Sequence, residues 1–444
     1  MSAPPSILVA GDGPAARRLT QRLRDHGHPD VRTVPDDGSG TPGPPSAGVT
    51  WIDRARRLVR AHVGGRETVH SYDTLVLVPR ARPRLPDLPG LVDRAGCLTD
   101  GVVALDGAAP APVHVPGAAA VLGDGPSAVE TASALAARGV DTTLVCSSPQ
   151  PLSAYLGAAC GALLAEELRR ARVSVRPAAV AVRRTPGLLH LADGTAVGAD
   201  TLLLCAGTVP DTRLARAAGL RVRHGIVVDE RLRTSDPRIH AIGDCAEAGG
   251  RVRPGPGAAW DQAETLAAIL GGHATAYRPG PSALRPRIHG ADVAAFGTLA
   301  DLDRPGSRLI GLTDPAGRRY ARLALRGDHV VAAVLLGLPE AIATIGLCHR
   351  HGRPLPSDRL GLLLNLEPRR TPDRGSDDDS PVCLCNNVSR RALRDAWRAG
   401  ARTAAALAGT TRATTGCGGC GPAVAHLCGV WASGLRDGEL EAAS

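Results

Sequence analysis

Lysine is absent from this 444-residue sequence, so arginine alone outweighs the acidic side chains and gives a net charge of +9. Aromatic residues make up 2% of the chain, and Phe296 is its single phenylalanine. A core with so few rings must be built from Ala, Val, Leu and Ile, which suits buried parallel strands. The arginines are scattered and are not interleaved with aromatic residues, so we do not expect a nucleic-acid partner.

Long apolar runs are also absent. No run of 18 apolar residues exists, so the sequence predicts no membrane-spanning helix and no membrane partner. The N-terminus lacks the charged and apolar regions of a signal peptide, and residues 6–10 predict a β-strand instead. Eleven cysteines in a chain without an export signal indicate metal or redox chemistry in the cytoplasm rather than disulfides.

A pattern of strand, glycine turn and helix occurs twice, over residues 6–27 and 118–146. The glycines would let the backbone approach a pyrophosphate, whose charge the helix N-terminus stabilises. The alternative is a pair of tight turns in ordinary α/β units. The motif positions are Gly11, Gly13, Ala16, Gly123, Gly125 and Ala128. Two such motifs in one chain favour two dinucleotide sites and an α/β fold.

Shorter patterns predict the remaining elements. Gly243 and Asp244 follow the apolar stretch 239–242; a carboxylate there can accept a bond from a ribitol hydroxyl or cap a helix. His349 and His351 are predicted to be exposed in a polar turn. The other predictions are a loop at 30–50, a strand at 73–79, an amphipathic helix at 162–174, short strands over 188–206, a helix at 257–270 and a hairpin over 324–337.

Two cysteine pairs near the C-terminus form the most specific pattern. Cys383 and Cys385 are followed by 31 residues and then by Cys417 and Cys420. Four thiolates are what a two-iron cluster requires, and the glycines around the second pair permit tight turns toward one centre. A structural zinc site remains the alternative on spacing alone, although zinc ribbons favour two intervening residues in both pairs. Cys428 lies outside the pattern and is predicted to be a buried thiol.

The sequence from VCLCNNVSRRALRDAW to TTGCGGCGPAVAHL resembles the [2Fe–2S] domain of the bacterioferritin-associated-ferredoxin type over residues 382–428. This resemblance implies that Cys383, Cys385, Cys417 and Cys420 hold the cluster.

The stretch from ADTLLLCAG to IHAIGDCAE is similar to the two-dinucleotide flavoprotein reductases. Within them it most resembles assimilatory NAD(P)H nitrite reductase large subunits and the electron-transfer subunit of assimilatory nitrate reductase. The resemblance implies FAD at Gly11, Gly13, Gly243 and Asp244. It also implies NAD(P)H at Gly123, Gly125, Gly207 and Glu130.

The implied fold has two Rossmann-like domains in a glutathione-reductase-like arrangement, a small α+β domain and a small helical [2Fe–2S] domain. The predicted boundaries are 1–110 with 226–275 for FAD, 111–225 for NAD(P), 284–366 for the small domain, 367–381 for a linker, 382–430 for the cluster domain and 431–444 for a tail.

Three segments depart from that family's pattern. Residues 30–50 are a short loop where the family has a longer segment near the flavin. Val78-Pro79-Arg80 replaces an Ala-Thr-Gly turn, and Cys146-Ser147-Ser148 lacks the carboxylate or arginine that would select between NADH and NADPH.

The sequence therefore predicts electron transfer from NAD(P)H through FAD and a [2Fe–2S] cluster to a partner, either a nitrate reductase catalytic subunit or a nitrite reductase component. The alternative is a redox-sensing or iron-sensing [2Fe–2S] module whose flavoprotein body is vestigial. A zinc-binding interaction domain is a third possibility.

Overall fold

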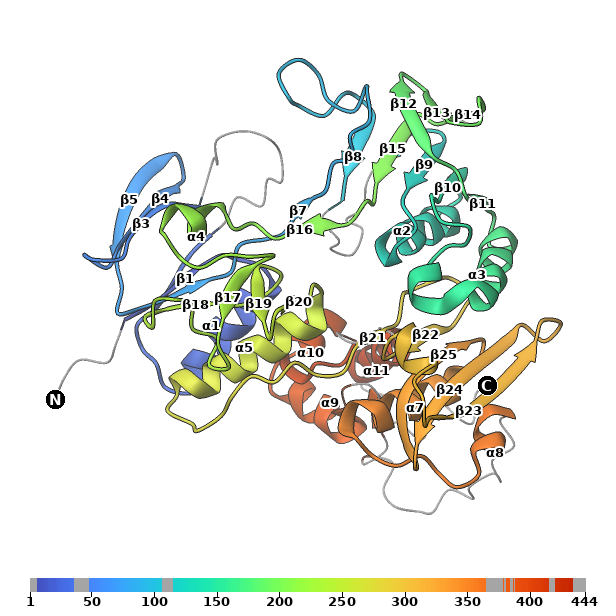
Figure 1. Ribbon diagram of the computed structural model, residues 1–444. Coiled ribbons are helices and arrows are strands. Elements are labelled where there is room, and N and C mark those ends of the chain that lie inside the picture. Colours follow the sequence, from blue (N-terminus) through green and yellow to red (C-terminus); the bar gives the residue numbers. More distant parts are fainter. Residues whose placement is uncertain are drawn as a thin grey trace. The chain divides into compact units, whose positions relative to one another are not determined.

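The computed structural model describes residues 6–35, 48–105, 115–364, 378, 381–383, 386, 388–414 and 420–433 (Figure 1). The chain folds as two compact units, the first from 1–123 with 181–280 and the second from 124–180 with 281–444. Among the helices described, none has the length and apolar character needed to cross a membrane.

A parallel sheet organises the first unit. Its strand order is β18 (Ile239–Ala241), β6 (Thr74–Leu77), β1 (Ile7–Ala10) and β2 (Val31–Val34). The predicted strand at 73–79 and helix at 257–270 are confirmed as β6 and α5 (Pro256–Leu270). In this unit α1 (Pro14–Asp25) and α5 lie side by side, and their apolar residues share one core with the sheet (Figure 1). Short strands of this kind, with most residues buried, are typical of parallel sheets covered by helices.

The predicted loop at 30–50 is partly wrong, because residues 31–34 form strand β2. Val31 and Val34 are 7% and 2% exposed, and the strand pairs in register with Ile7–Ala10. The Pro- and Gly-rich composition that follows concealed this short strand, since pairing with β1 outweighs local propensity. Residues 36–47 lie outside the described part of the chain.

An antiparallel meander that the sequence analysis did not anticipate follows in the first unit. It consists of β3 (Gly48–Asp53), β4 (Leu58–Val63) and β5 (Arg66–Ser71). Ile52, Val59 and Ala61 are buried in the core of the parallel sheet. The alternation of buried and exposed residues along β4 is typical of a strand with one face against a core.

A second group of parallel strands belongs to the first unit, with β15 (Thr201–Leu204) between β8 (Val102–Ala104) and β9 (Ala119–Leu122). The predicted short strands over 188–206 are confirmed by β13, β14 and β15. The smaller elements of this unit are β7 (Arg82–Pro83), β12 (Ala181–Thr185), β13 (Leu188–Leu191), β14 (Ala196–Gly198), β16 (Thr208–Val209), α4 (Arg213–Ala217), β17 (Ile226–Val228), β19 (Ala246–Ala248) and β20 (Arg251–Val252).

The second unit begins with α2 (Pro126–Ala137), β10 (Thr142–Val145), α3 (Ser153–Arg170) and β11 (Val173–Arg176). Strands β10 and β11 are parallel, and both α2 and α3 pack on β11. The helix predicted at 162–174 begins earlier, at Ser153, and ends at Arg170. Gly157, at φ +74°, interrupts its first turns, which is why the helical pattern was recognisable only further along.

An antiparallel sheet forms the middle of the second unit. Its order is β21 (Ala283–Leu284), β22 (Val293–Phe296), β25 (His329–Leu336), β24 (Arg319–Arg326) and β23 (Arg308–Asp314). The predicted hairpin is confirmed by β24 and β25. The helices here are α6 (Leu299–Leu302), α7 (Pro339–His351) and α8 (Arg359–Leu364). Helix α7 packs on β22 and β25.

The polar turn predicted around His349 and His351 is wrong, because both residues belong to the last turn of α7. Cationic side chains are favourable at that end of a helix, which explains why the sequence there is polar. His351 is exposed, whereas His349 is half-buried and its Nδ1 lies 3.3 Å from the carbonyl oxygen of Val330.

The C-terminal part of the second unit is a small helical domain, as predicted. It contains β26 (Pro381–Cys383), β27 (Val388–Ser389), α9 (Arg390–Arg398), α10 (Ala404–Thr411) and α11 (Gly421–Ser433). The rings of Trp397 and Trp431 lie 5.6 Å apart and pack with Leu393 around its core. Most of the predicted linker 367–381 and residues 434–444 of the predicted tail 431–444 lie outside the described residues, and residues 431–433 form the end of α11 instead of a tail.

Candidate functional site

The first glycine turn joins β1 to α1 with an uncapped helix N-terminus. Gly11 has φ +137°, and a methyl group there would collide with the carbonyl oxygen of Val78. Gly13 is the N-cap of α1, and the space where its side chain would project is open within 4 Å. Ala16 is fully buried where the helix meets the sheet. The first-turn N–H groups of α1 are therefore accessible to an anion, as a pyrophosphate site requires.

Gly243 lies beside this turn. A methyl group at Gly243 would lie 3.6 Å from Cγ1 of Val78 and 3.9 Å from Cβ of Ala15. The structure thus brings the predicted Gly11 and Gly243 together around Val78, at the carboxyl ends of β1, β6 and β18. Ligands bind at this edge of parallel sheets.

Asp244 is held next to the N-terminus of α5. Its Oδ1 accepts a 2.9 Å hydrogen bond from the N–H of Gly255, which is the N-cap of that helix. The N–H of Gly243 donates to Oε1 of the buried Gln262 at 2.6 Å. In this bond Asp244 contacts the N-cap residue of α5, and its contact with the flavin stays a prediction.

Arg80 lies at the position where the resembling family has glycine, and its side chain reaches the first glycine turn. Its Nε is 3.9 Å from Oδ1 of Asp12. The Nε of Arg17 also donates to the carbonyl oxygen of Asp12, at 2.8 Å. The departure at Val78-Pro79-Arg80 therefore places cationic charge beside the turn.

The second glycine turn has the same local geometry. Gly123 has φ +146°, and Gly125 is the N-cap of α2 with open space beside it. Ala128 is fully buried. The N–H of Cys205 donates to the carbonyl oxygen of Leu122 at 2.9 Å, so the predicted Gly207 follows a strand that ends at the same edge as β9.

Asp124 is a functional candidate that the sequence analysis missed. Its Oδ2 accepts hydrogen bonds from Oγ of Ser147 at 3.0 Å, from the N–H of Ser148 at 3.1 Å and from Oγ of Ser148. Partial burial raises the pKa of the Asp124 carboxyl, but these hydrogen bonds outweigh burial and hold the pKa below its ordinary value. Residues 146–148, which follow β10, include no acidic side chain. Asp124 of the glycine turn places a carboxylate beside them instead. The position of Asp124 between the motif glycines Gly123 and Gly125 could have identified it in the sequence.

Glu130 contacts a segment that lies far from it in the sequence. Its Oε1 accepts a 2.8 Å hydrogen bond from the N–H of Arg287. Oγ of Ser133, one turn further along α2, accepts a second 2.8 Å bond from the N–H of His289. Glu130 therefore fastens the segment 287–289 to α2, and its assignment to NAD(P)H remains a prediction.

Two of the four predicted cluster ligands lie within the described residues. Cys383 and Cys420 are 0% and 8% exposed and belong to one apolar core. The N–H of Thr414 lies 3.1 Å from Sγ of Cys420, the kind of hydrogen bond that iron–sulfur thiolates receive. Cys385 and Cys417 lie outside the described residues, and within the described ones no group of three or more His, Cys, Asp or Glu side chains is placed to hold a metal.

Cys146 and Cys160 are buried thiols, whereas Cys428, which was predicted to be buried, is half-buried. Burial raises the pKa of Cys146 and of Cys160 to about 12 and raises that of Cys428 as well. Thiols with such pKa values are poor nucleophiles, so Cys146 and Cys160 are poorly suited to thiol–disulfide exchange.

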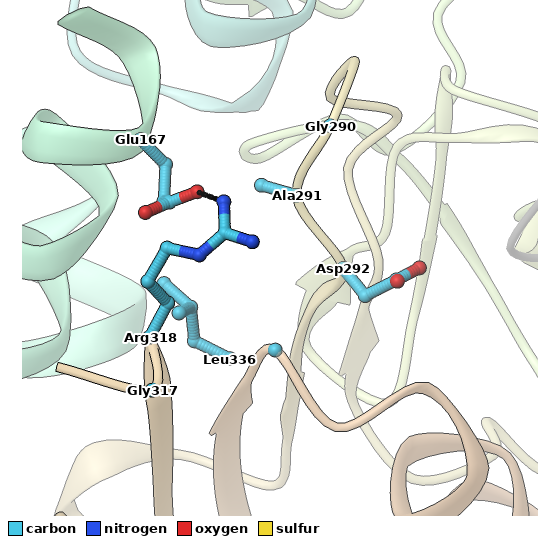
Figure 2. A pocket seen from close by; sticks show the side chains of 8 residues that line it. Glu167, Gly290, Ala291, Asp292, Gly317, Arg318 and Leu336 are labelled. Carbon is cyan, nitrogen blue, oxygen red and sulfur yellow. Dashed lines mark hydrogen bonds and ion pairs between the residues drawn. The ribbon is translucent and has the colours of Figure 1, made fainter. Parts of the chain in front are cut away.

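A small cavity of about 180 Å³ lies within the second unit (Figure 2). Figure 2 shows Glu167 from α3 and Arg318 pointing toward one another, with Nη1 of Arg318 3.3 Å from Oε2 of Glu167. None of the predicted site residues is among those that line this cavity. The ion pair fills part of it and joins α3 to the start of β24.

Comparison with known proteins bears on both halves of the chain. Residues 45–265 match the pyridine nucleotide-disulphide oxidoreductase family model, and residues 381–428 match the BFD-like [2Fe-2S] binding domain. The nitric oxide reductase FlRd-NAD(+) reductase of Aeromonas salmonicida is 32% identical over 292 residues, which are 56% of this chain and 72% of that protein. The chain belongs to the pyridine nucleotide-disulphide oxidoreductase family.

Relatives of this oxidoreductase that match most of its length are longer proteins. The nitrite reductase [NAD(P)H] large subunit of Klebsiella oxytoca is 31% identical over 405 residues, which are 86% of this chain and 41% of the relative. The assimilatory nitrate reductase electron transfer subunit of Bacillus subtilis is 26% identical over 398 residues, 85% of this chain and 49% of that protein. The chain thus spans less than half the length of either relative.

Solved structures confirm the predicted fold class. A FAD-dependent pyridine nucleotide-disulphide oxidoreductase from Desulfovibrio vulgaris has a TM-score of 0.66 and 22% identity, and the match covers 79% of this chain and 93% of that one. At this identity the likeness shows the fold alone.

Family membership makes the protein an NAD(P)H-dependent oxidoreductase with FAD, and the second match implies a [2Fe–2S] cluster rather than zinc. The residues present fit these groups. Both glycine turns leave space in front of an uncapped helix N-terminus. Cys420 already accepts an N–H···S hydrogen bond.

Proposed function

We propose that the protein carries electrons from NAD(P)H through FAD and its [2Fe–2S] cluster to a separate reductase. The observation that carries this proposal is the joining of a nicotinamide- and flavin-using body to a cluster domain in one chain. Nicotinamides give up two electrons together whereas a cluster takes one, and FAD supplies the chemistry that connects these steps.

The chain's own residues bind and orient the groups. In this proposal the turn Gly11–Gly13 and the N-terminus of α1 hold the FAD pyrophosphate, while Gly243 and Asp244 face its ribitol. Arg80 adds cationic charge at the same turn. These residues belong to the proposed FAD domain, residues 1–110 with 226–275.

The turn Gly123–Gly125 and the N-terminus of α2 would hold the nicotinamide nucleotide, with Gly207 at the same sheet edge. Cys383, Cys385, Cys417 and Cys420 would hold the cluster in the small helical domain. The core around Cys383 and Cys420 excludes water from one side of that centre.

The acceptor we propose is a nitrate reductase catalytic subunit or a nitrite reductase component, and we propose that the transfer takes place in the cytoplasm. The support is similarity over most of the chain to proteins named as a nitrite reductase large subunit and a nitrate reductase electron transfer subunit.

A UV–visible spectrum of the anaerobically purified full-length protein tests the proposal. We expect flavin and iron–sulfur absorption, both bleached by NADH or NADPH, and NAD(P)H-dependent reduction of cytochrome c. An iron–sulfur spectrum without flavin, and no reduction of the cytochrome, would overturn it. That result would instead favour a [2Fe–2S] sensing module, for which the altered turn at Val78-Pro79-Arg80 is the supporting observation.

A further inference from the structure

Two arginines outside the small helical domain contact the segments that adjoin its cysteine pairs. Nη1 of Arg350, in α7, donates a 3.0 Å hydrogen bond to Oδ1 of Asn386, the residue after Cys385. Nη2 of Arg287 donates a 3.3 Å hydrogen bond to the carbonyl oxygen of Thr414. Asn386 and Thr414, which are close in sequence to one cysteine pair each, therefore both accept a hydrogen bond from a guanidinium.

Arg287 contacts residues 412–414 directly and Arg350 contacts them through Asn386; we call these residues the ligand-loop segment. Arg412 and Thr414 both have φ +68°, a left-handed conformation that a β-branched residue such as Thr414 rarely adopts. Nδ2 of Asn386 donates to the carbonyl oxygen of Arg412 at 2.5 Å. A strained backbone of this kind persists only where its surroundings hold it, and these hydrogen bonds do so.

The ligand-loop segment contacts a cysteine sulfur directly. The N–H of Thr414 donates to Sγ of Cys420 at 3.1 Å. Hydrogen bonds to ligand sulfurs are among the features by which a protein sets the reduction potential of an iron–sulfur cluster. Holding Thr414 in its left-handed conformation therefore holds this hydrogen bond in place.

Arg287 is itself fixed from the other side. Its backbone N–H donates to Glu130, and the N–H of His289 donates to Ser133, so that two bonds fasten this segment to α2. The helix N-terminus of α2 begins at the second glycine turn. One arginine thus connects the proposed nucleotide-binding helix with the loop of a cluster ligand.

We propose that Arg287 and Arg350 hold Thr414 and Asn386 in place and raise the reduction potential of the cluster. A cluster held by four thiolates gains a negative charge when it accepts an electron, and a guanidinium stays protonated at any physiological pH. Nearby positive charge therefore stabilises the reduced cluster more than the oxidised one. Neither arginine is a ligand: each holds a neighbouring residue in place and adds positive charge near the cluster. The inference rests on the proposed function only because it requires the cluster.

A redox titration followed by EPR, on the full-length cluster-loaded protein, tests this inference. We expect Arg287→Gln to lower the ratio of reduced to oxidised cluster about tenfold at a fixed potential near the midpoint. Arg350→Gln should lower it by a smaller factor, because Asn386 separates that guanidinium from the loop. Arg285→Gln removes a charge two residues from Arg287 and serves as the matched control, with an unchanged midpoint.

The lysine variant separates charge from hydrogen-bond geometry. Arg287→Lys should retain most of the wild-type midpoint, and it replaces the glutamine variant if that protein fails to load its cluster. A midpoint that is the same in Arg287→Gln, Arg350→Gln and Arg285→Gln would overturn the inference while leaving the proposed function intact. Wild-type protein without any [2Fe–2S] signal would instead overturn both.

Discussion

The two glycine turns share the letters Gly-Asp-Gly-Pro yet differ in what their aspartates contact. Asp12 in the first turn is paired with Arg80, and its carbonyl oxygen accepts from Arg17. Asp124 in the second turn accepts hydrogen bonds from the neutral donors Ser147 and Ser148. Among the described residues, the same motif thus contacts arginines in one place and uncharged serine donors in the other.

This difference shows that the motif and the residues around it have separate functions. The glycines and the helix N-terminus create a pyrophosphate site in both turns. The arginines beside Asp12 favour an anionic ligand but would not distinguish a ribose hydroxyl from a ribose phosphate. The carboxylate of Asp124 lies at the end of β10, where charge discriminates a ribose hydroxyl from a ribose phosphate.

The largest expected effect comes from Gly11→Ala. The added methyl group would collide with the carbonyl oxygen of Val78 at a φ that alanine tolerates poorly. We expect a loss of about 3 kcal/mol in the free energy of unfolding, together with loss of flavin. Urea unfolding and the flavin-to-protein ratio measure the two.

Gly13→Ala is the matched control for that change. Its methyl group meets open space at φ −63°, so the free energy of unfolding should change by less than about 1 kcal/mol. Flavin content should still fall, because the methyl group occupies the space in front of the helix. A Gly11→Ala protein as stable as the wild type would contradict the packing described here.

A smaller effect is expected from Asp124→Ala. We expect the wild type to prefer NADH, because a 2′-phosphate would face the carboxylate of Asp124. The substitution should shift the ratio of kcat/KM for NADH over NADPH about tenfold toward NADPH. Steady-state kinetics with both nucleotides measure it. Asp12→Ala should leave the ratio unchanged. Equal ratios in the two variants would refute the prediction that Asp124, and not Asp12, sets the nucleotide preference.

The smallest effect is expected from Arg80→Ala. The ion pair with Asp12 spans 3.9 Å, and both side chains are 39% exposed. Such pairs contribute less than about 1 kcal/mol and are screened by salt. Urea unfolding should therefore show a small loss at low salt that disappears at high salt. A loss above about 2 kcal/mol would show that Arg80 has partners more important than Asp12.

Local patterns were sufficient for much of this fold. The strand–turn–helix units were predictable because β1 and β9 are short apolar runs that end at glycine, and each following helix begins at a proline. The hairpin β24–β25 was predictable from two apolar runs around Gly327. These elements are specified by residues adjacent in sequence.

Other features depend on partners distant in sequence. Val31 and Val34 form a strand only because β1 offers an edge to pair with. The carboxylate of Asp124 gains its role from Ser147 and Ser148, and Thr414 is held by Arg287. No local pattern contains such pairings, so the candidate site could be predicted by its glycines and cysteines but not by its charges.

Cys383 and Cys420 occupy the same apolar core as Leu393 and Trp397. A domain of roughly 50 residues has a small core, and a cluster bound by these cysteines would add to its stability. Iron supply would then determine how long this part of the protein survives in a cell. When clusters are scarce, newly made chains would present an unfinished C-terminal domain to proteases, and the amount of competent protein would follow the cell's capacity for cluster assembly.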